Sequence, residues 1–111
     1  MDIPEKDWKI IRSLKDEALD LTCQRILEKA SKIIEANDKK AHAKYLDLYK
    51  FIDNEDGEIG HRFNDLKRRN AIMEFSLWVF YDLVSAKDVE SLSKETQERV
   101  QSFVKSYNEE K

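Results

Sequence analysis

The chain has 111 residues, with 20 Lys and Arg against 23 Asp and Glu for a net charge of -3. This near balance provides no general attraction for nucleic acid or an anionic membrane, and 41% apolar content is too rich for a disordered chain. With only two glycines and one proline to form the turns of a β domain, the composition predicts an all-α fold.

Length and cysteine content predict a single helical domain over residues 1–111 in a reducing compartment. Cys23 is the one cysteine and therefore cannot form an internal disulfide, which favours a cytoplasmic location. The apolar run 71–84 is interrupted by Glu74, Ser76 and Asp82 and is shorter than the roughly 20 residues a bilayer requires. We therefore expect no membrane association.

The first predicted helix begins near Pro4, because proline suits the first helical position, and ends near Ala36. Its apolar residues occupy two faces rotated by roughly 150° at 100° per residue. One face holds Ile10, Ile11, Leu14, Ala18 and Leu21, and the other holds Leu19, Cys23, Ile26, Leu27, Ala30, Ile33 and Ile34. Either the two halves pack against different neighbours, or the helix bends near residues 19–22.

A second helix is predicted from Lys39 to Ile52, with Asp38 placed to cap it. The acidic stretch 53–57 contains a glycine, so we interpret it as a short connection that turns the chain back. The alternative is that this stretch is helical and continuous with its neighbours, since Asp and Glu also favour a first helical turn.

The longest apolar pattern predicts a central helix over about residues 58–84. Its positions recur every three or four residues, and from Ala71 onward the opposite side is apolar as well. A helix that is apolar all round is normally enclosed by other helices. The first face holds Ile59, Phe63, Leu66, Asn70, Met73, Leu77, Tyr81 and Val84.

Two serines mark the last predicted segments. Ser85 and Asp88 have the spacing of a capping box, and Ser93 is placed to cap a final helix from Lys94 to about Tyr107. The whole pattern predicts a small antiparallel bundle of about four helices around the long central helix.

The doubled apolar face after Ala71 favours a homodimer, because monomers rarely expose large apolar patches. The predicted interaction residues are Asn70, Glu74, Phe75, Trp78 and Val79. Asn70 stands in an apolar stripe, where a buried amide can fix register or partner. The alternative hypothesis is that the Asn70 side chain lies at the edge of that face and contacts water.

A metal-dependent alternative uses two carboxylate pairs. Glu17 with Asp20, and Glu55 with Glu58, could hold Mg²⁺ or Mn²⁺ in a helical nucleotide hydrolase. Glu58 and His61 also form one Glu-x-x-His pair, but a di-iron bundle requires two such pairs. A metal site is thus the weaker hypothesis, and we expect no cofactor.

The cluster Lys67-Arg68-Arg69 is the starting point for a nucleic-acid-binding regulator. On a helix these three side chains would point 100° apart, and Arg69 would continue a row of alternating charge with Glu58, Arg62 and Asp65. This pattern is typical of a solvated surface and disfavours nucleic acid. We therefore expect a non-catalytic interaction or regulatory module that self-associates or binds another protein.

Overall fold

The computed structural model describes residues 3–110 and confirms the all-α fold, since its regular elements are all helices in that range. The elements in chain order are α1 (Glu5–Glu35), α2 (Ala41–Phe63), the short 3₁₀ helix η1 (Arg68–Asn70), α3 (Ala71–Phe80), α4 (Ala86–Glu90) and α5 (Lys94–Glu109).

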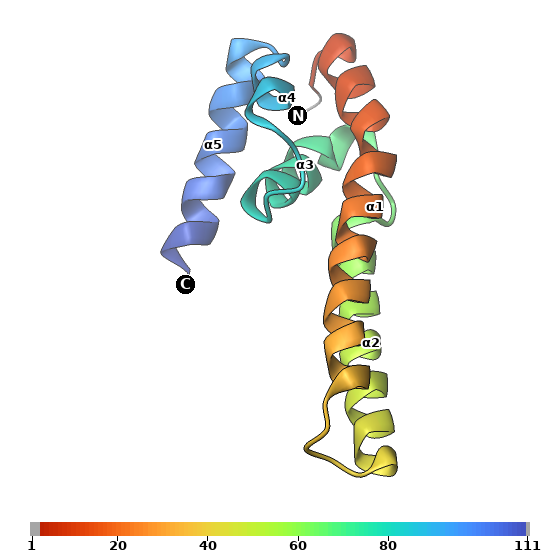
Figure 1. The fold of residues 1–111 in the computed structure, drawn as a ribbon. Helices are drawn as coiled ribbons and strands as arrows, with labels where there is room; N and C mark the ends of the chain where they lie inside the picture. Colours follow the sequence, from red (N-terminus) through yellow and green to blue (C-terminus); the bar gives the residue numbers. More distant parts are fainter. Residues whose placement is uncertain (1–2, 111) are drawn as a thin grey trace.

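The molecule is elongated because α1 and α2 form an antiparallel hairpin that extends beyond the other helices (Figure 1). Its extents are 53 × 28 × 23 Å and its radius of gyration is 16.8 Å. A compact chain of this length would have a radius of gyration of about 13 Å. We call residues 23–53 the hairpin arm, and the N-terminal half of α1 with α3, α4 and α5 the body.

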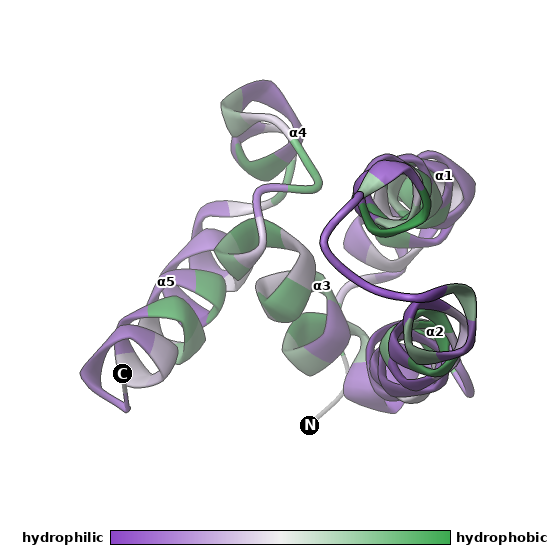
Figure 2. Ribbon diagram, turned by 60° about the horizontal axis from the view of Figure 1, so that its bottom comes forward, coloured by the Kyte–Doolittle hydropathy of each residue, from purple (hydrophilic) through white to green (hydrophobic). Residues whose placement is uncertain are grey.

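Helix α3 is the centre of the body. It lies between α5 on one side and the α1–α2 pair on the other (Figure 2), and seven of its ten residues are buried. The ring of Trp78 stacks on Phe63 with centroids 5.5 Å apart and meets Phe75 edge to face at 5.8 Å. The prediction that the chain after Ala71 is enclosed by other helices is confirmed.

The predicted continuous helix over 58–84 is wrong, because the chain leaves helical geometry between Phe63 and Arg68. Asp65 has a left-handed φ of 61°, a conformation that short polar residues adopt at helix ends. The Asn70 side chain then accepts a hydrogen bond from the Lys67 backbone N–H at 2.8 Å and donates one to the Asp65 carbonyl at 2.9 Å. These bonds organise the connection.

A left-handed residue also follows the end of α3 at Phe80, four residues before the predicted end at residue 84. Asp82 has φ 59°, and the N–H of Leu83 bonds the Trp78 carbonyl at 2.8 Å, the pattern of a Schellman motif. The Arg25 guanidinium reaches across from α1 and donates to the Tyr81 and Asp82 carbonyls at 2.8 and 2.9 Å. A cation at the C-terminal end of a helix stabilises it by complementing the helix dipole.

The acidic stretch 53–57 is helical, so the alternative for this stretch is the correct one and the predicted short connection is wrong. Helix α2 therefore runs unbroken from Ala41 to Phe63. Its N-cap position is Lys40 and carries no side-chain capping bond, so the prediction that Asp38 caps this helix is also wrong. The turn lies at 36–40 instead.

Helix α1 is one continuous helix, and its two halves have different surroundings (Figure 1). Its N-terminal half packs against the other body helices, whereas its C-terminal half lies along α2, with Arg25 reaching back to the end of α3. The two apolar faces in the sequence therefore correspond to two packing environments. The capping box at Ser85 is confirmed, with Asp88 N–H to Ser85 Oγ at 3.1 Å and Ser85 N–H to Asp88 Oδ2 at 2.9 Å.

A buried carboxylate joins the start of α1 to the start of α5. Asp7 accepts hydrogen bonds from the Ser93 N–H at 2.9 Å, the Ser93 hydroxyl at 2.6 Å and the Thr96 hydroxyl at 2.5 Å. Burial alone would raise the pKa of Asp7, but these three bonds and nearby Lys6 together lower it below the usual value. Ser93 thus occupies the predicted N-cap position of α5, but its hydroxyl donates a hydrogen bond to Asp7 and makes no capping bond to the helix backbone.

Candidate functional site

Three of the five residues predicted to contact a partner are buried inside the single chain. Phe75 and Trp78 have no exposed surface and Glu74 is almost fully buried. Val79 is half-buried against the same core. Within one chain, α1, α2 and α5 cover the face that the sequence assigned to a second copy.

Asn70 is half-buried, and its amide is bonded to the Lys67 and Asp65 backbone in the connection before α3. Both ends of the side chain are therefore engaged locally. The amide therefore helps to shape the loop before α3, and its role in register stays a prediction.

Glu74 is the most unusual ionisable group of the core. Burial, opposed by Lys15 and reinforced by Asp65, raises its pKa to about 7. Its Oε1 atom has no hydrogen-bond partner among residues 3–110. The carboxyl group is enclosed rather than facing a cleft, so it bears on stability and offers no place for a substrate.

The four carboxylates of the metal hypothesis do not converge. Glu17 and Asp20 line one shallow hollow on α1, Glu55 lines a second hollow between α1 and α2, and Glu58 lines a third beside α5. Among the described residues, no group of three or more His, Cys, Asp or Glu side chains could hold a metal ion. The predicted metal set is therefore not assembled in this fold.

The basic cluster 67–69 lies in the connection and η1, and two of its three side chains bond to other groups of the protein. Lys67 pairs with Asp65 at 3.1 Å, and the Arg68 side chain donates to the Ile3 carbonyl at 2.8 Å. The charge row predicted along one helix ends with the Arg62–Glu58 pair at 3.5 Å, because α2 stops at Phe63.

Two surface features were missed from the sequence. The first is a row of exposed apolar residues along the hairpin arm, which we call the outer strip. Its members and exposed fractions are Leu27 (66%) and Ile34 (54%) on α1, and Tyr45 (62%), Tyr49 (62%) and Ile52 (41%) on α2. The sequence did contain a signal, because Tyr45, Tyr49 and Ile52 are spaced four and three apart.

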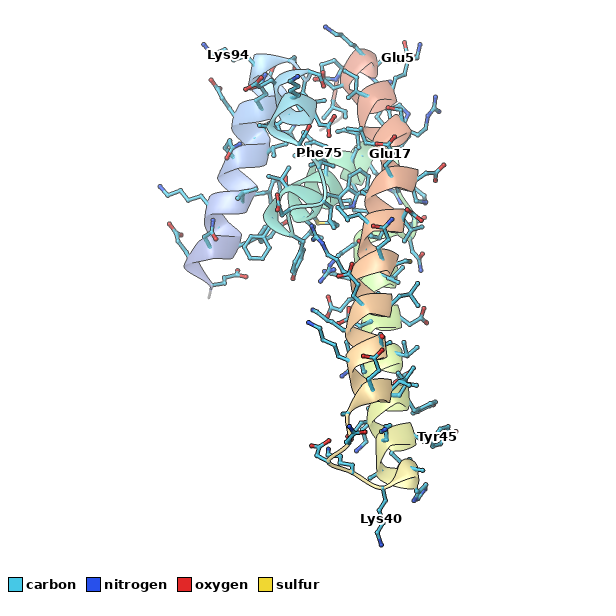
Figure 3. The ribbon with its side chains drawn as sticks, in the orientation of Figure 1. Glu5, Glu17, Lys40, Tyr45, Phe75 and Lys94 are labelled. Carbon is cyan, nitrogen blue, oxygen red and sulfur yellow. The ribbon has the colours of Figure 1, made fainter. Side chains whose placement is uncertain are left out.

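Both rows of the outer strip face away from the body. On α1, Leu27 lies about 160° around the helix from Arg25, whose side chain reaches the end of α3. On α2, Tyr45 likewise lies about 160° from His61, which lines the hollow beside α5. Figure 3 shows Tyr45 projecting from the side of the arm opposite α5.

The second missed feature is a hollow of about 590 Å³ where the C-terminal parts of α2, α3 and α5 meet. It is lined by Glu58, His61, Leu77, Phe80, Tyr81, Tyr107 and Glu110. These residues come from three helices, and sequence spacing within any one helix does not bring them together. We call it the aromatic hollow.

Comparisons with protein-family models, curated proteins and solved structures found no match to this chain. Within the described part of the chain, no helix is both long enough and apolar enough to cross a membrane. Any assignment of function therefore depends on the geometry of the outer strip and the aromatic hollow.

Proposed function

We propose that this protein is a non-catalytic interaction module that self-associates through the outer strip of its hairpin arm. The observation that carries this proposal is that Ala30 is the only buried residue in the whole arm, residues 23–53. Two helices side by side leave one flank of each without cover. A second arm laid on that flank would complete a four-helix arrangement.

The size of the strip supports a protein interface. Its five side chains together expose roughly 500 Å² of largely apolar surface, when their exposed fractions are applied to typical side-chain areas. The largest apolar patch on a typical monomer covers about 300–600 Å² and is often functional, and a stable interface buries about 800 Å² per partner. The strip thus supplies most of an interface centre, and polar side chains at its edges supply the rest.

A second copy of this chain is the occupant that the strip fits best. Two-fold dimers place the same patch on both partners, and two antiparallel helix pairs match each other in length and shape. Tyr45 and Tyr49 carry an apolar ring with a polar tip, a residue type that is enriched in such interfaces. A lone free cysteine, Cys23, supports a cytoplasmic setting for the dimer.

The test is light scattering on a sizing column across a hundredfold range of protein concentration. We expect a dimer for the native chain and a monomer for the double variant Leu27→Glu/Tyr49→Glu, because each charge would be buried at the centre of the interface. Met73→Glu is the matched control, since Met73 is a large apolar residue of α3 with 42% exposure, outside the arm.

Three outcomes are decisive. A dimer that persists in the double variant, or that is lost equally in Met73→Glu, would place the interface elsewhere. A native chain that is monomeric at every concentration would contradict self-association and leave the strip to a different protein.

A further inference from the structure

The aromatic hollow has the size of a small-ligand site. Its volume of about 590 Å³ lies within the roughly 300–1,000 Å³ range of ligand pockets. The wall of the hollow comes from rings of α3 and α5, and its rim includes carboxylates of α2 and α5. It is separate from the outer strip and does not depend on the proposed dimer.

Three aromatic rings form one wall. Phe80 meets Tyr81 edge to face with centroids 5.0 Å apart and an interplanar angle of 84°. Phe80 also meets Tyr107 at 5.6 Å and 69°. Each of these ring pairs is in edge-to-face contact, so a ligand in the hollow would meet only the ring surfaces that line it, where the quadrupole of an aromatic face attracts a cation.

The electrostatics of the hollow favour positive charge. Glu58 and Glu110 contribute two carboxylates, and the other lining residues are aromatic, apolar or histidine. Burial, together with the negative charge of Glu110, raises the pKa of the Tyr107 hydroxyl above its usual value. The Tyr107 ring thus lies in the negative potential of a carboxylate.

One ring of this wall already contacts a cation. The Arg62 guanidinium lies 3.6 Å from the centroid of the Tyr81 ring, in the neighbouring hollow between α1 and α2 that Tyr81 also lines. Arg62 partly offsets the charge of Glu58, since their side chains are 3.5 Å apart. Glu110 supplies the second carboxylate from α5.

We propose that the aromatic hollow binds a small organic ammonium ion, with its alkylated nitrogen against the rings of Phe80, Tyr81 and Tyr107 and its charge balanced by Glu58 and Glu110. An alkylated ammonium fits this chemistry better than a metal ion, because it is large, weakly hydrated and attracted to π faces. The carboxylates supply long-range attraction, and the rings supply the discrimination between cation and neutral molecule.

The test compares choline with 3,3-dimethylbutan-1-ol, a neutral molecule of the same shape. Each is titrated into the full chain at constant ionic strength, and binding is followed by NMR shifts of the Tyr107 and Tyr81 ring protons. We expect choline to bind with a Kd on the order of 1 mM and the neutral alcohol to bind at least about tenfold more weakly.

Variants locate the binding in the hollow. Tyr107→Leu should weaken choline binding about tenfold, whereas Tyr107→Phe should retain it because the π face remains. The pair Glu58→Gln/Glu110→Gln should weaken binding about threefold and reduce its dependence on salt. Met73→Leu, at an exposed position of α3 that does not line the hollow, is the matched control and should leave binding unchanged.

Several results would overturn the proposal. Equal affinity for choline and the neutral alcohol would mean that the hollow selects apolar shape and not charge. No shift up to about 100 mM choline, far above the expected Kd, would exclude a cation site. Unchanged binding in a folded Tyr107→Leu variant would place the site elsewhere, and if that variant fails to fold, the glutamine pair decides the question.

Discussion

The body and the hairpin arm solve the problem of burying apolar side chains in opposite ways. In the body, α3 is covered on two sides, and Phe75 and Trp78 lose all contact with water. In the arm, the two helices bury only Ala30 among residues 23–53. A helix pair without a third layer cannot enclose its side chains, so the arm depends on its partner helix and on whatever covers its outer strip.

The polar contacts differ in the same way. The ends of two body helices are fixed by side chains from distant elements: Asp7 at the start of α5 and Arg25 at the end of α3. At the tip of the arm the bonds are local, as in Lys39 to Asp47 at 2.6 Å and the Lys44 side chain to the Ile34 carbonyl at 2.8 Å. Stability should therefore be concentrated in the body.

The largest difference in the free energy of unfolding should come from removing one aromatic ring from the body and one from the arm. Trp78→Ala deletes a fully buried side chain and its hydrogen bond to the Arg62 carbonyl, and should lower the free energy of unfolding by about 3–5 kcal/mol. Tyr45→Ala, on an exposed ring of the arm, should change it by less than about 0.5 kcal/mol in the monomer. Urea unfolding at low protein concentration measures both, and equal losses would refute the contrast.

Asp7→Ala should come next, with a loss of about 2–4 kcal/mol, because it leaves buried donors of Ser93 and Thr96 without an acceptor. The pKa of Asp7 is lowered in the folded protein, so its contribution is complete above the unfolded value near 3.8 and is lost as the pH falls through the folded value. Unfolding measured from pH 6 to pH 2 should show a steeper acid loss for the native chain than for Asp7→Asn. Parallel curves would contradict this role.

Glu74→Gln should raise the stability of the fold, in contrast to the loss expected for Asp7→Ala. Its pKa is raised from 4.5 to about 7, so the native chain loses stability as the pH rises from 4.5 to 7 and carries the full cost above that. The variant should be more stable than the native chain by about 1–3 kcal/mol at pH 8, and nearly equal to it at pH 4. Thermal melts at these two pH values provide the measurement. A gain of the same size at both would show that charge is not the cause.

Asn70→Leu should have the smallest of these effects, a loss of about 1–2 kcal/mol. The variant removes the bonds that hold the Lys67 N–H and the Asp65 carbonyl in the connection before α3. Asn54→Leu, at an exposed position of α2, is the control and should be close to neutral. If Asn70→Leu instead stabilised the fold and broadened its oligomer distribution, the amide would have the register role that the sequence suggested.

Local sequence signals predicted the helical class, the first helix almost to its ends, the capping box at Ser85 and the start of the last helix after Ser93. Each depends on residues close in sequence. The break after Phe63 escaped prediction because Phe63, Leu66 and Met73 keep helical spacing across it, while the cause is the left-handed Asp65 and the bonds of Asn70. Apolar periodicity alone does not distinguish one long helix from two helices in register.

The outer strip and the aromatic hollow were not predicted from the sequence for a different reason. The sequence placed the partner surface at the most apolar segment, but that segment is the one that the fold covers first. Exposure is decided by which helices lie beside a face, and α2 reaches only one flank of α1 in the arm. The aromatic hollow depends on three helices meeting, so its residues share no spacing that could reveal them.

The contact between Asp7 and Ser93 also has a consequence for the order in which the protein is made and folded. Its partners are 86 residues apart, whereas α1 and α2 pair across a turn of a few residues. The hairpin can therefore form while synthesis continues, but α3 has no cover from α5 until α5 itself has emerged. We expect closure of this contact to be a late folding event, and the apolar α3 to be exposed to chaperones until it occurs.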